Sequence, residues 1–126
     1  ENYHRDVDDV LFLKVFVYLT DVDEGAGPHV YVKGSHKDRK FLDIRRYADA
    51  EIESSYPTES ILKITGKAGS AFIENTYGLH KGLVARQASR ILLQFEYSLF
   101  PIGAYEYKDK YIGADQVDGY VNRLYA

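Results

Sequence analysis

Residues 90–99 read RILLQFEYSL and alternate apolar and polar side chains more regularly than any other stretch of the chain. One face is apolar throughout and comprises Ile91, Leu93, Phe95, Tyr97 and Leu99. On the other face, Leu92 alone interrupts the polar side chains. Such alternation predicts a β-strand, because successive side chains of a strand point to opposite faces of the sheet. We expect the apolar face to be covered by another part of the molecule.

Four further segments are rich in the β-branched and aromatic residues typical of strands, and they span residues 10–18, 29–33, 60–65 and 70–74. The connections between them carry glycine, proline and acidic residues, as in DVDEGAGP at residues 21–28. In the first strand and its continuation, Val15, Val17 and Leu19 share one face, whereas lysine, threonine and aromatic residues occupy the other. We interpret this segment as a buried strand with one mixed face.

The period of the pattern changes over residues 38–54, where apolar residues recur at steps of three and four positions. This spacing predicts one amphipathic helix or two short ones, packed on a sheet as an insertion. We predict a loop over residues 81–89 and a tyrosine-rich tail lying over the sheet from Pro101 onward. Several short strands, one helical segment and glycine turns favour a mainly β fold, either a β-sandwich or a small barrel.

The composition is that of a soluble globular domain, with 45% hydrophobic and 28% charged residues. A chain of 126 residues is long enough to bury a core, so we expect a single domain over residues 1–126. Lys and Arg number 16 against 19 Asp and Glu, which is not the basic excess that nucleic-acid binding requires. We therefore expect small-molecule partners. Because no signal peptide or membrane-spanning apolar run is present, we also expect a cytoplasmic protein without membrane association.

A possible metal site begins at residues 3–6, which read YHRD. In an extended segment His4 and Asp6 point to the same side, and His80 is the only histidine after residue 36. Because the chain has no cysteine, a metal must be bound by nitrogen and oxygen ligands. Two histidines and one carboxylate leave three coordination positions open, a set typical of non-haem Fe(II) oxygenases. We hypothesise that His4, Asp6 and His80 bind a metal.

The sequence contains competitors for these roles. A second His-x-Asp occurs at His36 and Asp38, within a charged stretch that we interpret as a solvated turn. His36 is therefore interpreted as structural, and His29, which has no acidic residue two positions on, as a histidine at a strand end. An arginine can bind a carboxylate through two parallel hydrogen bonds, which a lysine cannot. Arg90 opens a predicted strand, whereas its rival Arg86 lies in a predicted loop.

The order His-x-Asp, a long gap, His, and an arginine ten residues later resembles the Fe(II)/2-oxoglutarate-dependent dioxygenases. The passage DVDEGAGPHVYVKGSHK at residues 21–37 resembles the phytanoyl-CoA dioxygenase family in particular. This resemblance implies a double-stranded β-helix, the jelly-roll fold shared with cupins. It also implies hydroxylation of a small organic substrate, with dioxygen and 2-oxoglutarate consumed and succinate and carbon dioxide formed. The presence of Asp6 favours hydroxylation, since relatives that halogenate lack the carboxylate.

Under this resemblance His4, Asp6 and His80 are the catalytic iron ligands, and Arg90 anchors 2-oxoglutarate. Thr76, Tyr18 and Lys14 are further candidates for lining the cosubstrate pocket. Family members carry a long segment before the His-x-Asp that covers the main sheet, and here we expect it to be missing. The apolar face of residues 91–99 would then be covered by the helix predicted over residues 41–52, by the tail or by a second copy in a homodimer.

Two other classes of function remain open from the sequence. One is a jelly-roll remnant that folds but has lost catalysis. The other is a metal-dependent cupin-like protein that uses no oxo acid, which Arg90 argues against.

Overall fold

The protein is mainly β, with two antiparallel sheets and little helix. The computed structural model describes residues 2–102. Its strands are β1 (Phe12–Tyr18), β2 (His29–Val32), β3 (Ile61–Ile64), β4 (Ala71–Glu74), β5 (His80–Gly82) and β6 (Leu92–Ser98). Its helical elements are α1 (Asp49–Glu53) and the 3-10 helices Glu24–Ala26, Ser35–Lys37 and Thr58–Ser60. No helix within these residues is long and apolar enough to cross a membrane.

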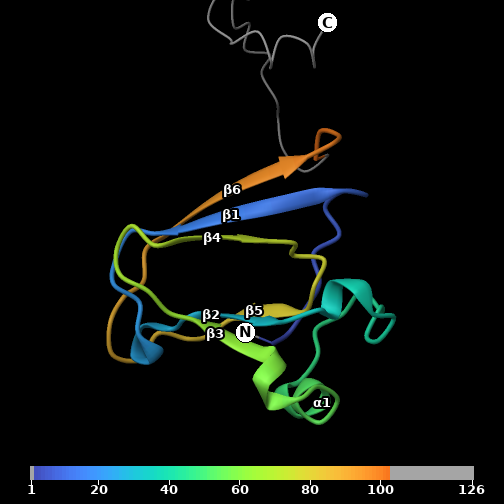
Figure 1. Cartoon of the computed structure of the whole chain (residues 1–126), viewed down its shortest axis with the longest axis horizontal. Helices are drawn as coiled ribbons and strands as arrows, with labels where there is room; N and C mark the ends of the chain where they lie inside the picture. The colour runs from blue at the N-terminus through green and yellow to red at the C-terminus, as the bar shows by residue number, and fades with distance from the viewer. Residues whose placement is uncertain (1, 103–126) are drawn as a thin grey trace, which may run out of the picture.

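The six strands form two three-stranded sheets in the orders β4-β1-β6 and β3-β2-β5. Every strand pair is antiparallel. Figure 1 shows the two sheets as separate layers, and α1 lies beyond the β3-β2-β5 layer. Side chains from one face of each sheet point toward the other sheet, and residues of both sheets line a common cavity.

The five predicted strands are confirmed as β1, β2, β3, β4 and β6, with ends that differ by one or two residues. The predicted loop over residues 81–89 is wrong at its start, because β5 continues to Gly82. This strand is three residues long, too short to show an alternation in the sequence. It forms because its backbone pairs with β2, where His29 lies opposite Gly82 and Tyr31 opposite His80.

The helix predicted over residues 38–54 is largely wrong, since only the five residues of α1 are helical. The guanidinium of Arg5 accounts for much of the difference. It donates to the carbonyls of Ser35, Lys40 and Phe41 at 3.0, 2.9 and 2.9 Å, so these oxygens are not available to a helix. Phe41 also has a φ of 56°, which lies outside the helical region.

A second long-range contact keeps the middle of this segment extended. Tyr47 pairs with Tyr3, each donating its amide to the carbonyl of the other at 2.8 and 3.1 Å. Both rings are buried in a core cluster that also contains Val30, Val32, Ile52 and Leu79. Ile52 belongs to α1, so the helix covers the outer side of the β3-β2-β5 sheet. The expectation that it covers the apolar face of residues 91–99 is therefore wrong.

The outward faces of β1 and β6 are the more apolar ones. Leu93, Phe95 and Tyr97 are 41%, 45% and 64% exposed, so among the described residues nothing buries the apolar face of β6. The predicted tail from residue 103 onward lies outside the described residues. In β1 it is the mixed face, with Phe16 and Lys14, that is buried between the sheets. The interior is consequently polar in part, and ion pairs such as those of Lys14 with Asp6 and His29 with Glu74 lie within it.

Candidate metal centre

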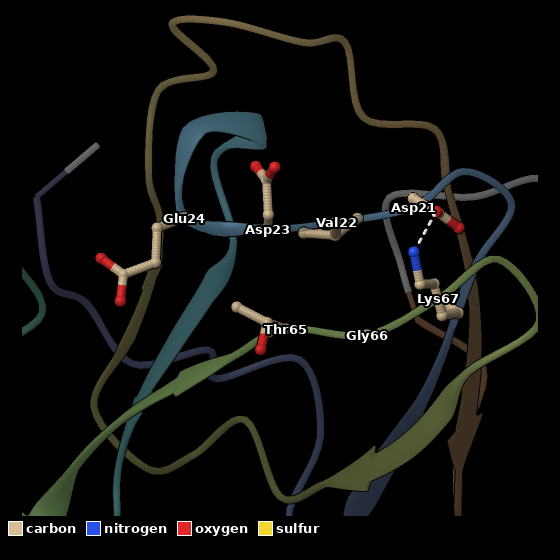
Figure 2. A pocket seen from close by; sticks show the side chains of 7 residues that line it. All are labelled: Asp21, Val22, Asp23, Glu24, Thr65, Gly66 and Lys67. Atoms are coloured by element: carbon tan, nitrogen blue, oxygen red, sulfur yellow. Dashed lines mark hydrogen bonds and ion pairs between the residues drawn. The ribbon is translucent and has the colours of Figure 1, made fainter.

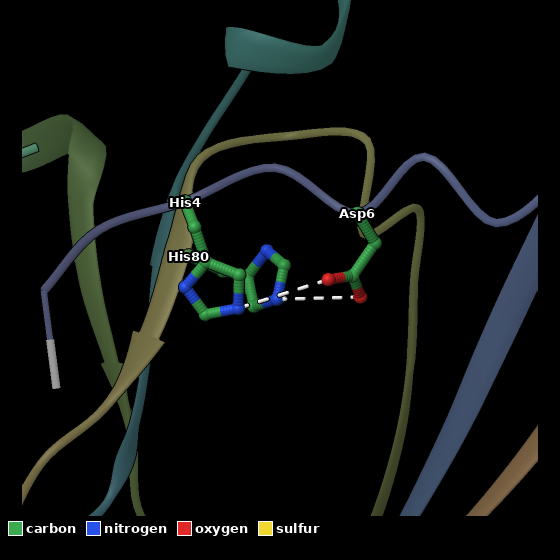
Figure 3. Close-up of side chains that lie close together, drawn as sticks. All are labelled: His4, Asp6 and His80. Atoms are coloured by element: carbon green, nitrogen blue, oxygen red, sulfur yellow. Dashed lines mark ion pairs between the residues drawn. The ribbon is translucent and has the colours of Figure 1, made fainter. Parts of the chain in front are cut away.

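The side chains of His4, Asp6 and His80 lie close together and point toward one another (Figure 3). Backbone bonds set their positions. His4 and His80 exchange amide–carbonyl hydrogen bonds of 3.0 Å in both directions, which brings their ring centroids to 4.4 Å. The amide of Asp6 donates to the carbonyl of Thr76 at 2.9 Å. The chain near its N-terminus is thus tied to the segment that carries the second histidine.

The three side chains present one donor atom each to a common point. Nε2 of His4 lies 3.7 Å from Oδ1 of Asp6, and Nε2 of His80 lies 3.5 Å from Oδ2 (Figure 3). All three donor atoms lie within 4.8 Å of one another. Nitrogen and oxygen ligands roughly 2.0–2.2 Å from a metal ion lie about 3–4 Å from each other, so the distance from each histidine to the Asp6 carboxylate fits a shared ion. Within residues 2–102 this is the only such group of three.

The remaining ring nitrogens leave both Nε2 atoms available as ligands. Nδ1 of His80 lies 2.9 Å from the carbonyl of Gly78, and Nδ1 of His4 lies 3.1 Å from the carbonyl of Asn2. A histidine that donates Nδ1–H to a carbonyl keeps the lone pair on Nε2. Arg46 lies 3.2 Å from Nδ1 of His4, but the tautomer that uses the Asn2 carbonyl is the one that can bind a metal.

The electrostatics of the site favour a neutral imidazole and an ionised carboxylate. Burial lowers the pKa of His80 below its ordinary value. Burial of Asp6 acts to raise the pKa of its carboxyl, but the hydrogen bond from Lys14 and the nearby His80 outweigh that effect and lower it. Metal binding requires a neutral imidazole and an ionised carboxylate, and these pKa shifts favour both.

Lys14 holds the carboxylate of Asp6 in place. Its Nζ lies 2.7 Å from Oδ2 of Asp6 and 2.8 Å from Oδ2 of Asp8, and its side chain is buried. The carboxylate of Glu96 follows at 3.6 Å. Burial would lower the pKa of Lys14, but the hydrogen bonds to Asp6 and Asp8 outweigh it and raise the pKa. Lys14 therefore remains charged and contacts the carboxylate of Asp6 directly.

A cavity of about 270 Å³ opens beside the three residues. Both sheets contribute to its wall, which is lined by His4, Asp6, Lys14, Phe16, His29, His80, Gly82, Arg90, Leu92 and Gln94. The guanidinium of Arg90 donates to the carbonyl of Gly27 at one side of this cavity. The cavity can therefore hold a small molecule between a metal and a fixed positive charge.

Comparison with known proteins agrees with this geometry. Residues 1–86 match the family model described as Phytanoyl-CoA dioxygenase (PhyH), which is more than half of the chain. The chain belongs to the phytanoyl-CoA dioxygenase family. Searches of curated proteins and of solved structures each found no match.

Membership in this family places the protein in the superfamily of Fe(II)- and 2-oxoglutarate-dependent dioxygenases. The matched segment contains all three candidate ligands and ends before Arg90. The assignment of Arg90 therefore depends on its position in the cavity. The donor set itself, two imidazoles and one carboxylate without a thiolate, fits the ferrous iron that this family uses.

Two of the predicted pocket residues are not part of the cavity wall. The hydroxyl of Tyr18 is fully buried, donates to the carbonyl of Ile64 at 2.6 Å and accepts from the amide of His29 at 3.3 Å. Thr76 is buried next to Asp6 and contacts it through the backbone. Neither residue is among those that line the cavity, whereas Lys14, the third predicted pocket residue, is.

The competitors identified in the sequence lie elsewhere. His36 lies 3.2 Å from the hydroxyl of Tyr31, while Asp38 accepts from Tyr56 at 2.5 Å and lies 3.4 Å from Arg5. Within residues 2–102, the structure brings no third ligand to this second His-x-Asp.

Arg86 lines a different cavity together with Glu24, Asp49, Lys81, Leu83 and Val84. The structure places Arg90, and not Arg86, beside the three candidate ligands.

A larger hollow of about 410 Å³ lies over the connection between β1 and β2 and the turn after β3 (Figure 2). It contains none of the predicted site residues. Its charged side chains belong to the surface, and the ion pair of Lys67 with Asp21 at 2.8 Å has side chains that are 87% and 60% exposed. A solvated ion pair of this kind contributes little binding energy, so size alone does not make this hollow the functional site.

The strand-end position predicted for His29 is confirmed, because His29 is the first residue of β2. The sequence did not predict that His29 also lines the cavity and pairs with Glu74. The partner Glu74 could not have been identified, because it comes from a strand of the other sheet.

Proposed function

We propose that this protein is an Fe(II)- and 2-oxoglutarate-dependent dioxygenase that hydroxylates a small organic substrate and releases succinate and carbon dioxide. The observation that supports this most directly is the meeting of His4, Asp6, His80 and Arg90 at one cavity. Family membership gives the class of cofactor, and the geometry supplies residues for each part of it.

The first part of the site is the metal-binding face. Nε2 of His4 and His80 and one carboxylate oxygen of Asp6 would hold the ion from one side. Bound Fe(II) supplies open coordination positions at which an oxo acid and dioxygen can meet. Lys14 keeps the Asp6 carboxylate ionised and oriented, and the backbone pairing of His4 with His80 fixes the distance between the two rings.

The second part is the anchor for a dicarboxylate. Arg90 precedes β6 and directs its guanidinium to the cavity wall, where it also bonds to the carbonyl of Gly27. This backbone contact fixes the planar group and prepares it for a carboxylate. A hydrogen bond to a charged group contributes about 1.5–3 kcal/mol, enough to select an acid with a second carboxylate.

We further propose that the two facing sheets form a double-stranded β-helix. Two antiparallel sheets that both line the cavity beside the candidate ligands support this assignment.

Anaerobic titration tests the proposed function. Fe(II) is added to the metal-free protein first and 2-oxoglutarate second, and the visible spectrum is followed for the weak metal-to-ligand charge-transfer band of an oxo-acid chelate. We expect one equivalent of Fe(II) and a band that saturates with 2-oxoglutarate. Tight Fe(II) binding without the band would indicate a cupin-like metal protein, and absence of Fe(II) binding would indicate a non-catalytic remnant.

A further inference from the structure

A buried histidine and a buried glutamate face each other across the two sheets, and the metal site uses neither of them. His29 of β2 and Glu74 of β4 are each 5% exposed. Nε2 of His29 lies 3.0 Å from Oε1 and 2.9 Å from Oε2 of Glu74. Within residues 2–102, Oε2 has no further hydrogen-bond partner. Each of these two residues is thus the main polar partner of the other.

Stability alone is a weak reason for such a pair. Removing two polar groups from water carries a large desolvation penalty, and apolar residues of similar volume are often as stabilising or more so. An apolar residue could pack at this position, since the ring centroids of Phe16 and Phe72 lie 5.1 and 5.7 Å from that of His29. The role of the pair is therefore better inferred from its position in the cavity than from its contribution to stability.

Strand register places His29 between the metal ligands and the arginine. Tyr31, two residues further along β2, lies opposite His80. Gly27, two residues earlier, accepts the hydrogen bond from Arg90. The ring of His29 is stacked near that of His80, with centroids 5.5 Å apart and an angle of 23° between the planes. A molecule that reaches from the metal to Arg90 must pass His29.

Glu74 determines which atom of His29 is left for a ligand. It occupies Nε2, and no described residue makes a hydrogen bond to Nδ1. Because His29 lines the cavity, Nδ1 is the polar atom through which it can contact a bound molecule. The pairing with Glu74 also fixes the ring orientation, as carboxylates do for histidines elsewhere.

We propose that His29, held by Glu74, is a cosubstrate-binding residue whose Nδ1 hydrogen-bonds the dicarboxylate between the metal and Arg90. This inference rests on the proposed function. Glu74 acts as a positioning residue, because it would touch His29 and not the cosubstrate. Glu74 thus lies at Nε2 and the bound carboxylate would lie at Nδ1, so each ring nitrogen of His29 has one polar partner.

The test replaces the pair by apolar residues of similar shape, His29→Phe together with Glu74→Leu, so that no buried carboxylate is stranded. Fe(II) affinity, 2-oxoglutarate affinity from the charge-transfer band and melting temperature are measured on the same samples. We expect 2-oxoglutarate to bind roughly tenfold to a hundredfold more weakly, while Fe(II) affinity and melting temperature stay close to wild type. His36→Phe, a histidine outside the cavity, is the matched control and should change neither affinity.

A folded double variant with wild-type 2-oxoglutarate affinity would overturn the inference. Should the double variant fail to fold, Glu74→Gln decides, because it preserves size and an acceptor. It should weaken 2-oxoglutarate binding and shift the position of the charge-transfer band, and an unchanged affinity and band would overturn the inference equally. If the wild-type protein binds Fe(II) but no 2-oxoglutarate, both the proposed function and this inference fail. If the wild-type protein and the variants bind 2-oxoglutarate equally well, only this inference fails.

Discussion

His80 contributes to the protein in two separable ways. Its backbone pairs with His4 and with β2, and its imidazole lies with His4 and Asp6 in the candidate metal site. Substitution of the side chain keeps the backbone contribution, so the consequences for metal binding and for folding can be measured apart.

Replacing His80 by alanine should abolish Fe(II) binding, because one of three ligands is lost. The melting temperature should fall only slightly, since the strand pairing of β5 does not depend on the imidazole. Iron content after anaerobic loading and thermal unfolding check both statements. His36→Ala is the control, and loss of iron in that variant would move the metal to the second His-x-Asp.

Arg90→Ala should weaken 2-oxoglutarate binding about tenfold to a hundredfold and leave Fe(II) affinity nearly unchanged. Arg90→Lys should recover only part of the affinity, because an ammonium cannot make the two-pronged contact. The measurement is again the charge-transfer titration. Arg86→Ala, which changes an arginine of the other cavity, should behave as wild type. If Arg86→Ala loses the cosubstrate and Arg90→Ala does not, the two roles are exchanged.

Lys14→Met should destabilise the metal-free protein by about 3 kcal/mol near neutral pH, because it leaves the carboxylates of Asp6 and Asp8 without their partner. The pH dependence gives a sharper test. The pKa of Asp6 in the folded protein lies below its ordinary value of 3.8, so its contribution to stability is present above pH 3.8 and is lost as the pH falls through the lower folded value.

In Lys14→Met the pKa of Asp6 is no longer lowered by this hydrogen bond, so the acid-side loss of stability should become shallower. Denaturant unfolding at several pH values measures the slope. Lys63→Met is the control, since its ion pair with Glu24 is exposed on both sides and should contribute about 1 kcal/mol or less. An equal pH slope in wild type and Lys14→Met would contradict this account of Asp6.

At the scale of elements, Arg5 organises the segment that the sequence pattern misassigned. Its side chain is almost fully buried and donates to backbone carbonyls of four residues, namely Ser35, Lys40, Phe41 and Tyr77. Arg5 lies between His4 and Asp6 in the sequence, so the contacts that shape residues 35–41 also hold these two candidate ligands in place.

Arg5→Lys should lower the free energy of unfolding by about 2 kcal/mol, since an ammonium cannot satisfy several carbonyls spread over a planar fork. Fe(II) binding should weaken as well, by a smaller factor than in His80→Ala. Chemical unfolding and iron titration measure the two effects. Arg39→Lys, an exposed arginine of the same segment, should leave both unchanged, and equal losses in the two variants would show that Arg5 has no special role.

The sequence could predict five strands because alternation is local. It could not tell which face of a strand is interior, and for both β1 and β6 the more apolar face is the outer one. The helix over residues 38–54 failed for a related reason, since the contacts from Arg5 and Tyr3 that prevent it come from a distant part of the chain.

The candidate site followed the same rule. His4 and Asp6 could be proposed from their spacing and His80 from the family pattern, whereas the pairing of His29 with Glu74 joins strands of two different sheets and leaves no local signal.

At the scale of the whole molecule, the β4-β1-β6 sheet presents a broad apolar outer face. Its exposed members include Leu13, Ile73, Leu93, Phe95 and Tyr97. Large apolar patches are uncommon on soluble monomers and mark surfaces that are normally covered. Helix α1 lies on the opposite side of the molecule (Figure 1), so within residues 2–102 no element is placed to cover this face.

Of the three covers predicted from the sequence, residues 103–126 of the same chain and a second copy in a homodimer stay open, and sedimentation distinguishes them. If the C-terminal residues cover the face, the intact chain sediments as a monomer and a chain ending at Pro101 self-associates. If two copies pair symmetrically through the face, both chains sediment as dimers, and Phe95→Lys converts both to monomers because it places a charge within an apolar interface. Lys63→Glu, which changes charge on the other sheet, should not alter the mass in either case. Monomers for both the intact and the shortened chain, with normal solubility, would contradict the claim that this face needs a cover at all.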